Sequence, residues 1–345
     1  MPHKLALIGF GVVGQGLAEI LRDKADELGA RYGFEAQVVA ITTATRGSIY
    51  HPGGLDISTA LTTIQETGSL NDYPESPGLP RGWEGLATIR DCNADTIVET
   101  TWTDLETGEP AIGHVRAAFE AGKHVVTCNK GPVALAYHDL KEMAEANGVK
   151  WGIEGTVMAG TPALRLAQTE LAGCHISEVR GILNGTTNYV LTQMEDEASY
   201  AEALAEAQRL GYAEADPTAD VEGHDALGKL LILSAVVMDT RLTWEQVNCQ
   251  GISRLTLDDV ERAKREGKRW KLIAQLRRTG EGVEARVSPQ AIRADAPLAG
   301  VGGATNAITF VTDLLGEVTL VGPGAGGRET GFALLADLLD ISRGG

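Results

Sequence analysis

The sequence predicts an α/β protein, with a Rossmann-type doubly wound parallel sheet followed by an α+β domain that has a mostly antiparallel sheet. Short apolar runs alternate with helical segments over the first 155 residues, which is typical of a parallel sheet. A glycine-rich turn, GFGVVG, separates the first apolar run from the first helix. After residue 156, several helices precede segments of alternating character, a pattern that favours antiparallel strands.

We expect the first domain to span residues 1–155 and to be completed by residues 316–345. The last helix, TGFALLADLLDIS, is expected to pack back on this domain. Residues 45–93 are rich in Gly, Pro and Ser, so we expect broken helices and loops there. The expected parallel strands, with helices between them, lie at residues 4–9, 36–44, 94–101, 123–129 and 149–156.

The second domain is expected to span residues 156–315. The segment SYAEALAEAQRLGY opens with Ser199 and has Glu202 three residues later, which predicts a capping box. Helices are expected at 159–173, 186–196, 199–210 and 220–238, a strand at 174–185, and antiparallel strands at 269–278, 282–288, 307–315 and 317–324.

The charge and the cysteine content of the chain argue against several kinds of binding partner and site. Acidic residues outnumber basic ones 47 to 30, for a formal net charge of −17, which argues against nucleic acid or an anionic membrane surface. Four cysteines without a CxxC pair indicate neither a zinc site nor a disulfide framework, so a cytoplasmic protein is expected. The chain enters a strand at once and has no apolar run of about 18 residues, so we expect neither a signal peptide nor a membrane span.

The turn GFGVVG lies directly between a strand and a helix, which makes it a dinucleotide fingerprint. Gly9 permits the tight turn, Gly11 lets the backbone approach a pyrophosphate, and Gly14 allows close packing of helix and strand. The helix start adds free N–H groups for phosphates. The expected cofactor-binding residues here are Gly9, Phe10, Gly11, Val12, Val13 and Gly14.

The end of the second strand favours NADP(H) over NAD(H). A ribose 2′-hydroxyl is usually held there by an acid, but this segment reads ITTATRG and contains no carboxylate. Arg46 and the neighbouring hydroxyl groups suit a 2′-phosphate instead. The alternative is that Arg46 is an ordinary exposed loop residue.

Lys229 is the leading candidate for chemistry. From Ala226 to Met238 it is the only ionisable residue in a helix that is apolar on all sides, so the helix is expected to be buried. Asp225 lies four residues earlier and shares a helix face with Lys229. Removing each charge from water costs several kcal/mol, and pairing offsets this cost only if the geometry of the pair is good. A cleft in which water and substrate reach both groups would avoid the cost. A lysine in such a cleft can exchange a proton with a substrate oxygen during hydride transfer.

Other polar residues surround this candidate. Lys130 falls between a strand end and a helix, where doubly wound folds bind ligands, although it can also be a surface lysine. Gly185 and Thr186 lie at a helix start whose N–H groups would bind a substrate carboxylate, although a threonine there can be only an N-cap. The acids upstream of Lys229, some of which could hold a substrate ammonium group, are Glu214, Asp216, Asp220 and Glu222.

Taken together, these segments resemble the homoserine dehydrogenase family over almost the whole chain. The family oxidises homoserine to aspartate 4-semialdehyde, or the reverse, with NAD(P), a step of threonine and methionine biosynthesis. The resemblance implies a short form without a C-terminal regulatory domain, and a homodimer formed through the sheet of the second domain. The motifs are GFGVVG, TTWTDLETGEP, VVTCNKGPVA, IEGTVMAGTP, GILNGTTNYVL, LGYAEADPTADVEGHDALGKLLIL and GPGAGGRETG.

The resemblance also implies roles for single residues. Lys229 would donate and accept the proton, Asp225 would orient the cluster, and Lys130 would lie near the nicotinamide. Further implied residues are Glu214 at the substrate amino group, Tyr212 and Thr186 in the substrate pocket, and Thr100 and Gly326 at the cofactor. A monovalent cation, usually sodium, would be held by Glu154 and the backbone carbonyls of Val157, Ala159 and Thr161.

Two other functions remain open from the sequence. One is a cysteine-dependent semialdehyde dehydrogenase with Cys128 as nucleophile, for which Lys130 could stabilise the thiolate. The other is a nucleotide-binding sensor without activity. The sensor predicts loss of the acid–lysine cluster, which is instead complete in this sequence.

Overall fold

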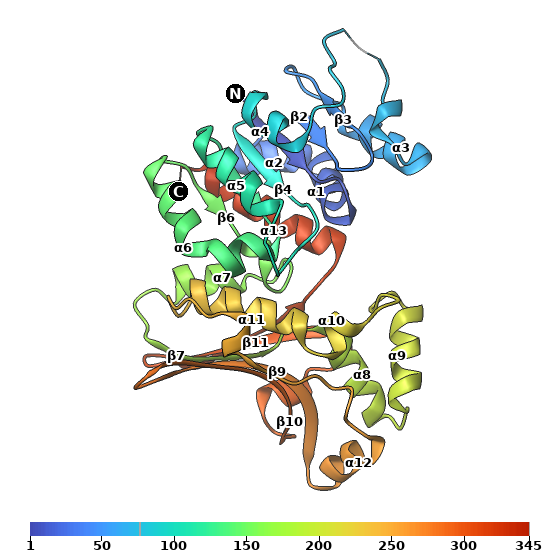
Figure 1. The fold of residues 1–345 in the computed structure, drawn as a ribbon, viewed down its shortest axis with the longest axis vertical. Helices are drawn as coiled ribbons and strands as arrows, with labels where there is room; N and C mark the ends of the chain where they lie inside the picture. Colours follow the sequence, from blue (N-terminus) through green and yellow to red (C-terminus); the bar gives the residue numbers. More distant parts are fainter. Residues whose placement is uncertain (76, 345) are drawn as a thin grey trace. The chain divides into compact units, whose positions relative to one another are not determined.

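The computed structural model describes residues 1–75 and 77–344, and these form two compact units (Figure 1). One unit consists of Met1–Gly160 and the segment from Gly326 onward, and the other of Thr161–Ala325. The expected boundary at residue 315 differs because β12 (Gly316–Pro323) pairs along its whole length with β11 (Thr305–Thr312), which keeps β12 in the second unit. The predicted α/β class, with one parallel and one antiparallel sheet, is confirmed.

The first unit is built around a sheet in the order β3-β2-β1-β4-β5-β6. Among the described strands of this sheet, β3 (Ser48–Tyr50) alone is antiparallel to its neighbour. This strand was not predicted, since only broken helices and loops were expected in residues 45–93. Three residues are too few to show the alternation by which a strand is recognised in a sequence. The parallel strands are β1 (His3–Ile8), β2 (Ala36–Thr42), β4 (Thr96–Glu99), β5 (His124–Thr127) and β6 (Trp151–Gly152).

Helices cover both faces of this sheet. Leu5 and Leu7 of β1 belong to one buried cluster, whereas Ala6 and Ile8 belong to another, as the alternation of side chains along a strand requires. The last helix packs against the first (Figure 1). The helices are α1 (Val12–Asp23), α2 (Ala25–Tyr32), α3 (Ile57–Thr67), α4 (Gly85–Asp91), α5 (Ala111–Glu120), α6 (Lys130–Ala146) and α13 (Gly327–Ser342), with short 3-10 turns at Leu70–Asp72 and Glu154–Thr156.

The second unit contains a sheet in the order β12-β11-β7-β9-β10-β8. Its long strands are antiparallel to their neighbours, whereas the two-residue β8 (Asn248–Cys249) runs parallel to β10. All the strands predicted for this region are present. Besides β11 and β12 they are β7 (Ile176–Ile182), β9 (Lys268–Thr279) and β10 (Gly282–Arg293).

The helices of this unit differ from expectation at two places. The predicted helix 220–238 is interrupted at Gly223, whose φ of +84° places it in the left-handed region. The predicted helix 159–173 begins only at Ala163 and continues as a π-turn, Leu166–Glu170. The helices are α7 (Ala163–Arg165), α8 (Gly185–Glu195), α9 (Tyr200–Arg209), α10 (Thr218–Val221), α11 (His224–Val236) and α12 (Leu257–Arg265), with 3-10 turns at Trp244–Gln246 and Pro297–Gly300.

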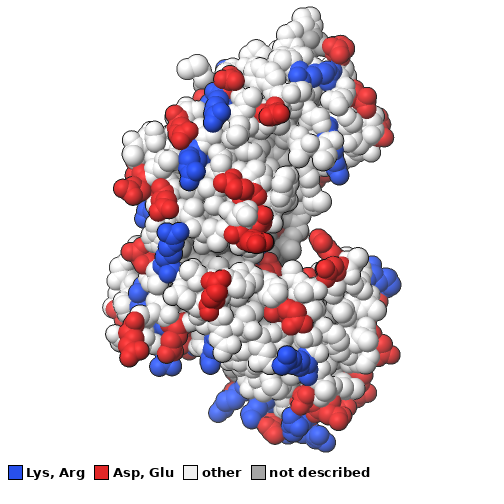
Figure 2. Space-filling view, viewed as in Figure 1, with Lys and Arg blue, Asp and Glu red and all other residues white. Residues whose placement is uncertain are grey.

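Charged side chains are mixed over the surface shown in Figure 2. Acidic groups are spread widely, and Lys and Arg are interspersed among them instead of forming one broad basic patch on this face. Among the described residues, no helix is both long enough and apolar enough to cross a membrane.

Candidate active site

A buried lysine–carboxylate pair lies on α11 of the second unit. Lys229 is only 6% exposed, and its Nζ donates to Asp225 Oδ2 at 2.8 Å and to the backbone carbonyl of Leu183 at 2.6 Å. The two side chains are one helical turn apart, as their spacing predicts. Residues 226–235 of α11 are all buried, which confirms the expectation of an apolar, enclosed helix.

Asn184 joins this pair to a second carboxylate. Its Nδ2 donates to Asp220 Oδ1 at 2.7 Å and to Asp225 Oδ2 at 3.0 Å. Asn184 is not among the site residues that the sequence predicts. In the sequence, Asn184 directly precedes GTT at the start of a helix. This position indicates an N-cap residue, but it does not indicate a side chain that bridges two carboxylates.

Asp220 has an altered acidity in this cluster. Burial raises the pKa of its carboxyl group above the ordinary value, and the nearby charge of Asp225 acts in the same direction. Hydrogen bonds from Asn184 and Thr186 and the charge of Lys229 oppose the rise in pKa. A carboxyl group with a raised pKa beside an ammonium group is typical of sites where protons or charged ligands are exchanged.

The predicted substrate residues lie at the entrance to α8 and in the loop after α9. Thr186 Oγ1 donates to the backbone carbonyl of Tyr212 at 2.6 Å. Gly185 opens α8, and a Cβ there would lie 2.7 Å from the carbonyl oxygen of Ala304, so glycine is required. Glu214 is exposed, and within the described part of the chain its side chain lies outside the bonded cluster of Asn184, Asp220, Asp225 and Lys229.

The glycine-rich turn of the first unit is shaped by close contacts. Gly9 has a φ of +101°, and a Cβ there would lie 2.5 Å from the Thr100 carbonyl oxygen. Thr100 Oγ1 donates to the Gly9 carbonyl at 3.0 Å, so it holds this turn. Gly11 faces open space, and Val12 beside it is 76% exposed. The turn therefore leaves an accessible backbone at the start of α1, where phosphates bind in dinucleotide-binding folds.

Arg46 lies in the turn between β2 and β3. Its side chain is exposed, and its backbone N–H donates to Thr43 Oγ1 at 2.8 Å. The turn residues 43–47 contain no carboxylate, so a guanidinium group and hydroxyl groups are the polar side chains offered there.

Lys130 is the first residue of α6, and its position is set by buried polar groups. Asn129 caps the helix by accepting from Gly131 N at 3.0 Å, while its Nδ2 donates to the Trp102 carbonyl at 2.9 Å. Asn129 N in turn donates to Thr127 Oγ1 at 2.9 Å. The loop after β4 is thereby tied to the start of α6.

A fully buried carboxylate, Glu99, lies beneath this junction. It accepts from Thr101 N at 3.2 Å and from Thr127 Oγ1 at 3.2 Å, and His114 Nδ1 lies 3.4 Å from Oε1. Glu99 is not among the residues that the sequence predicts. It is an acid at the end of an apolar strand, DTIVETT, and this pattern occurs in many parallel strands without a functional role.

Cys128 has the properties of a structural thiol. Burial and the negative charge of Glu99 raise its pKa to about 12, although Lys130 acts in the opposite direction. A nucleophilic cysteine needs a lowered pKa, so the geometry disfavours Cys128 as a nucleophile.

The segment 154–161 combines a buried carboxylate with strained backbone conformations. Glu154 is buried, and Met158 and Ala159 adopt left-handed backbone conformations, with φ of +59° and +49°. Such strained conformations in non-glycine residues turn carbonyl groups in unusual directions and are typical of functional loops. Across residues 1–75 and 77–344 there is no group of three or more His, Cys, Asp or Glu side chains that could hold a metal ion.

Gly326 precedes α13 and also requires glycine. Its φ is +128°, and a Cβ there would collide with the side chain of Glu329. It lies in the first unit with the other predicted cofactor residues.

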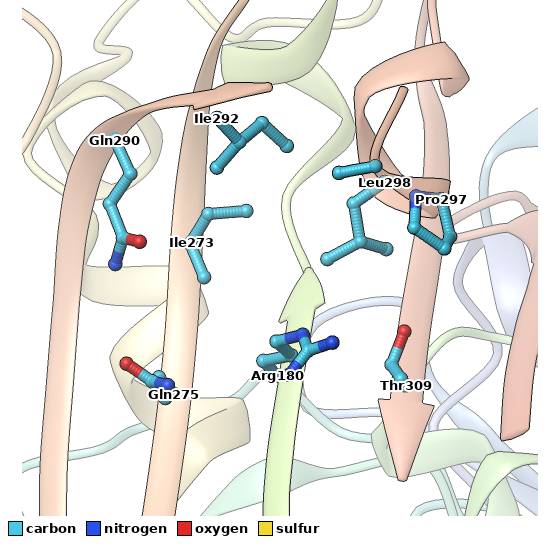
Figure 3. Close-up of a pocket in the computed structure, with 9 residues that line it drawn as sticks. Arg180, Ile273, Gln275, Gln290, Ile292, Pro297, Leu298 and Thr309 are labelled. Carbon is cyan, nitrogen blue, oxygen red and sulfur yellow. The ribbon is translucent and has the colours of Figure 1, made fainter. Parts of the chain in front are cut away.

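A cavity of about 80 Å³ opens on the second sheet, and none of its lining residues is a predicted site residue (Figure 3). Its only charged lining residue, Arg180, is already paired with Glu178 at 3.0 Å and with Glu317 at 2.5 Å. The remaining walls are mainly apolar. The lining residues are Arg180, Ile273, Gln275, Gln290, Ile292, Ala296, Pro297, Leu298 and Thr309.

The first unit is Rossmann-type with an open glycine-rich turn, and the second contains a buried lysine–carboxylate pair. These features fit a nicotinamide-dependent oxidoreductase. Comparison with known proteins identifies its family. The family model "Homoserine dehydrogenase" matches residues 162–339, and "Homoserine dehydrogenase, NAD binding domain" matches residues 9–154. The chain belongs to the homoserine dehydrogenase family, whose members are NAD(P)-dependent oxidoreductases.

Individual relatives support this membership. An NAD(+)-dependent homoserine dehydrogenase of Pseudomonas canavaninivorans is 46% identical over 98% of this chain and 96% of its own. The structure of a homoserine dehydrogenase from Thiobacillus denitrificans has a TM-score of 0.84 at 37% identity, covering 99% of this chain and 74% of that one. A hyperthermophilic archaeal homoserine dehydrogenase in complex with NADPH also has a TM-score of 0.84, at 30% identity, covering 100% and 99%.

Proposed function

We propose that this protein transfers hydride reversibly between L-homoserine and L-aspartate 4-semialdehyde, a step of threonine and methionine biosynthesis, with Lys229 as proton donor and acceptor. The observation that carries the proposal is the buried Lys229 ammonium, bonded to Asp225 and to the Leu183 carbonyl. Family membership supplies the substrate class, since the relatives named above are homoserine dehydrogenases.

Lys229 suits proton exchange for a geometric reason. An ammonium group has three N–H groups, and two of those on Lys229 point at Asp225 and at the Leu183 carbonyl. We assign the third direction to the substrate oxygen. In the oxidation the neutral amine form of Lys229 accepts the hydroxyl proton and becomes the ammonium. In the reduction the ammonium donates this proton to the developing alkoxide and becomes the neutral amine. A bound nicotinamide supplies or accepts the hydride.

Substrate recognition uses the groups around this lysine. Asp220 and Glu214 are proposed to hold the substrate ammonium group, and the N–H groups of Gly185 and Thr186 at the start of α8 to hold its carboxylate. Tyr212 is proposed to close the pocket, which is supported by the bond between its carbonyl and Thr186.

For the cofactor we propose a preference for NADP(H). Arg46 and the hydroxyl groups of the β2–β3 turn support it, since no acid is present there to hold a ribose 2′-hydroxyl. The archaeal relative bound to NADPH agrees with this proposal, whereas the Pseudomonas relative is NAD(+)-dependent. The binding residues proposed are Gly9, Phe10, Gly11, Val12, Val13, Gly14, Arg46, Thr100, Lys130 and Gly326.

We propose in addition a bound monovalent cation and a homodimer. The cation, sodium or a similar ion, would be held by Glu154 and by backbone carbonyls of Val157, Ala159 and Thr161, and it would stiffen this strained loop. The dimer would form through the sheet of the second unit. The proposal is supported by Val321, an apolar side chain of that sheet that is 57% exposed. Val321 pairs with Ala307, which belongs to the same apolar cluster as Ile273 of the cavity wall.

The proposed function is tested by an absorbance assay at 340 nm. Purified protein is mixed at alkaline pH with L-homoserine and either NADP or NAD, with L-serine and L-threonine as control substrates. We expect reduction of NADP that depends on homoserine and is faster than reduction of NAD. Turnover of neither cofactor with homoserine would contradict the proposal.

A further inference from the structure

Asn184 joins three helices through one side-chain amide. It is the N-cap residue of α8, where its Oδ1 accepts from Thr187 N at 2.9 Å. Its Nδ2 donates to Asp220 of α10 and to Asp225 of α11, at 2.7 and 3.0 Å. Asn184 is itself only 4% exposed. Both the oxygen and the nitrogen of this buried amide are therefore hydrogen-bonded.

The partners fix the orientation of the amide. A backbone N–H can only donate and an ionised carboxylate can only accept, so Oδ1 must face Thr187 and Nδ2 must face the two carboxylates. The bonds form a continuous chain from Thr187 N through Asn184 and Asp225 to Lys229 Nζ. Each bond in such a chain polarises the next, which strengthens the donors of Asn184.

Helix capping alone does not require asparagine here. Ser, Thr or Asp would supply the same cap oxygen for α8. Only an amide supplies in addition two donors on one nitrogen. These donors lie between Asp220 and Asp225, of which Asp225 also accepts from Lys229, and they offset the repulsion between the two carboxylates.

We propose that Asn184 is a positioning residue that holds Asp220 and Asp225 at fixed places beside Lys229 during proton transfer. The inference rests on the proposed function, because it assumes that Lys229 exchanges the proton. It adds to that function a residue that would act through Asp220 and Asp225.

Two variants separate the bridge from the cap. Asn184→Asp and Asn184→Ser both keep a cap oxygen, but neither can donate to two carboxylates. We expect kcat with homoserine to fall about 10- to 100-fold in each, with a smaller change in the KM for NADP. Asn184→Asp should also move the acidic limb of the pH profile of kcat/KM to higher pH, because a third carboxylate raises the pKa of its neighbours. Asn184→Ser should move it in the same direction but less, because it removes the hydrogen bond that lowers the pKa of Asp220 without adding a charge.

The control is Ser199→Asp, which places a new carboxylate at the N-cap of α9 in the same unit. It should leave kcat and the pH profile unchanged, and NADPH binding, followed by fluorescence, should be retained in all three variants. If both Asn184 variants have the kcat and the pH profile of the wild type, the positioning role is wrong. If the wild type itself does not turn over homoserine, the proposed function fails instead.

Discussion

Arg46 is the residue on which the choice between the two nicotinamide cofactors depends. We expect Arg46→Ala to raise the KM for NADP about 10- to 100-fold, because a charged hydrogen bond to the 2′-phosphate is lost. The KM for NAD should change less than about twofold, since NAD has no phosphate there. The control is Arg116→Ala, which removes an exposed arginine from α5. Equal losses with both cofactors would refute the 2′-phosphate role.

At the same scale, some site residues could be predicted from the sequence and others could not. Lys229 and Asp225 were visible because a charged pair at helical spacing in an apolar segment has few explanations. Asn184 and Glu99 were not visible, because their roles depend on partners 28 to 41 residues away. Spacing along a chain predicts contacts within one helix but not contacts between helices.

At the scale of elements, the crossing of α1 and α13 depends on glycine. A Cβ on Gly331 would lie 2.6 Å from Leu17 N and 2.9 Å from the carbonyl carbon of Gly16, which are backbone atoms that cannot yield cheaply. We expect Gly331→Ala to lower the free energy of unfolding by about 1–3 kcal/mol and to lower the urea midpoint. Because α1 begins at the glycine-rich turn, the KM for NADP should also rise.

The control for this variant is Gly29→Ala in α2. A Cβ on Gly29 meets no atom within 4 Å, so this change should stabilise the protein by about 0.5–1 kcal/mol through helix propensity alone. Loss of stability in both variants would show that glycine at the crossing has no special role.

Most helices and strands could be predicted because they are long enough for the repeat of their apolar residues to be recognised in the sequence. The five parallel strands and the antiparallel strands were expected, as was the capping box of α9, which is formed by Ser199 and Glu202. The break at Gly223 was missed because helical segments, α10 and α11, lie on both sides of it. The glycine is required by its positive φ, which a hydrophobic pattern does not reveal.

At the scale of the whole molecule, the dimer is the feature with the clearest physical test. We expect sedimentation to give twice the chain mass of 36.5 kDa. Val321→Glu should shift the species toward the monomer, because it would bury a charge in the proposed interface, where Val321 is an exposed apolar side chain of the single chain. Leu314→Glu, in the exposed turn between β11 and β12, should leave the mass unchanged. A wild-type monomer would contradict the dimer.

The central claim is that the Lys229 ammonium exchanges the proton. Its most direct test is single-turnover reduction of aspartate 4-semialdehyde by Lys229→Ala, with and without added ethylamine. Lys271→Met is the control, since Lys271 is a buried lysine of the same unit that bonds Asn188 and Val301 instead. We predict a rate about 10³-fold below wild type, partial rescue by the amine, and retained NADPH binding. A rate for Lys229→Ala within tenfold of wild type, unaffected by the amine, would contradict the account.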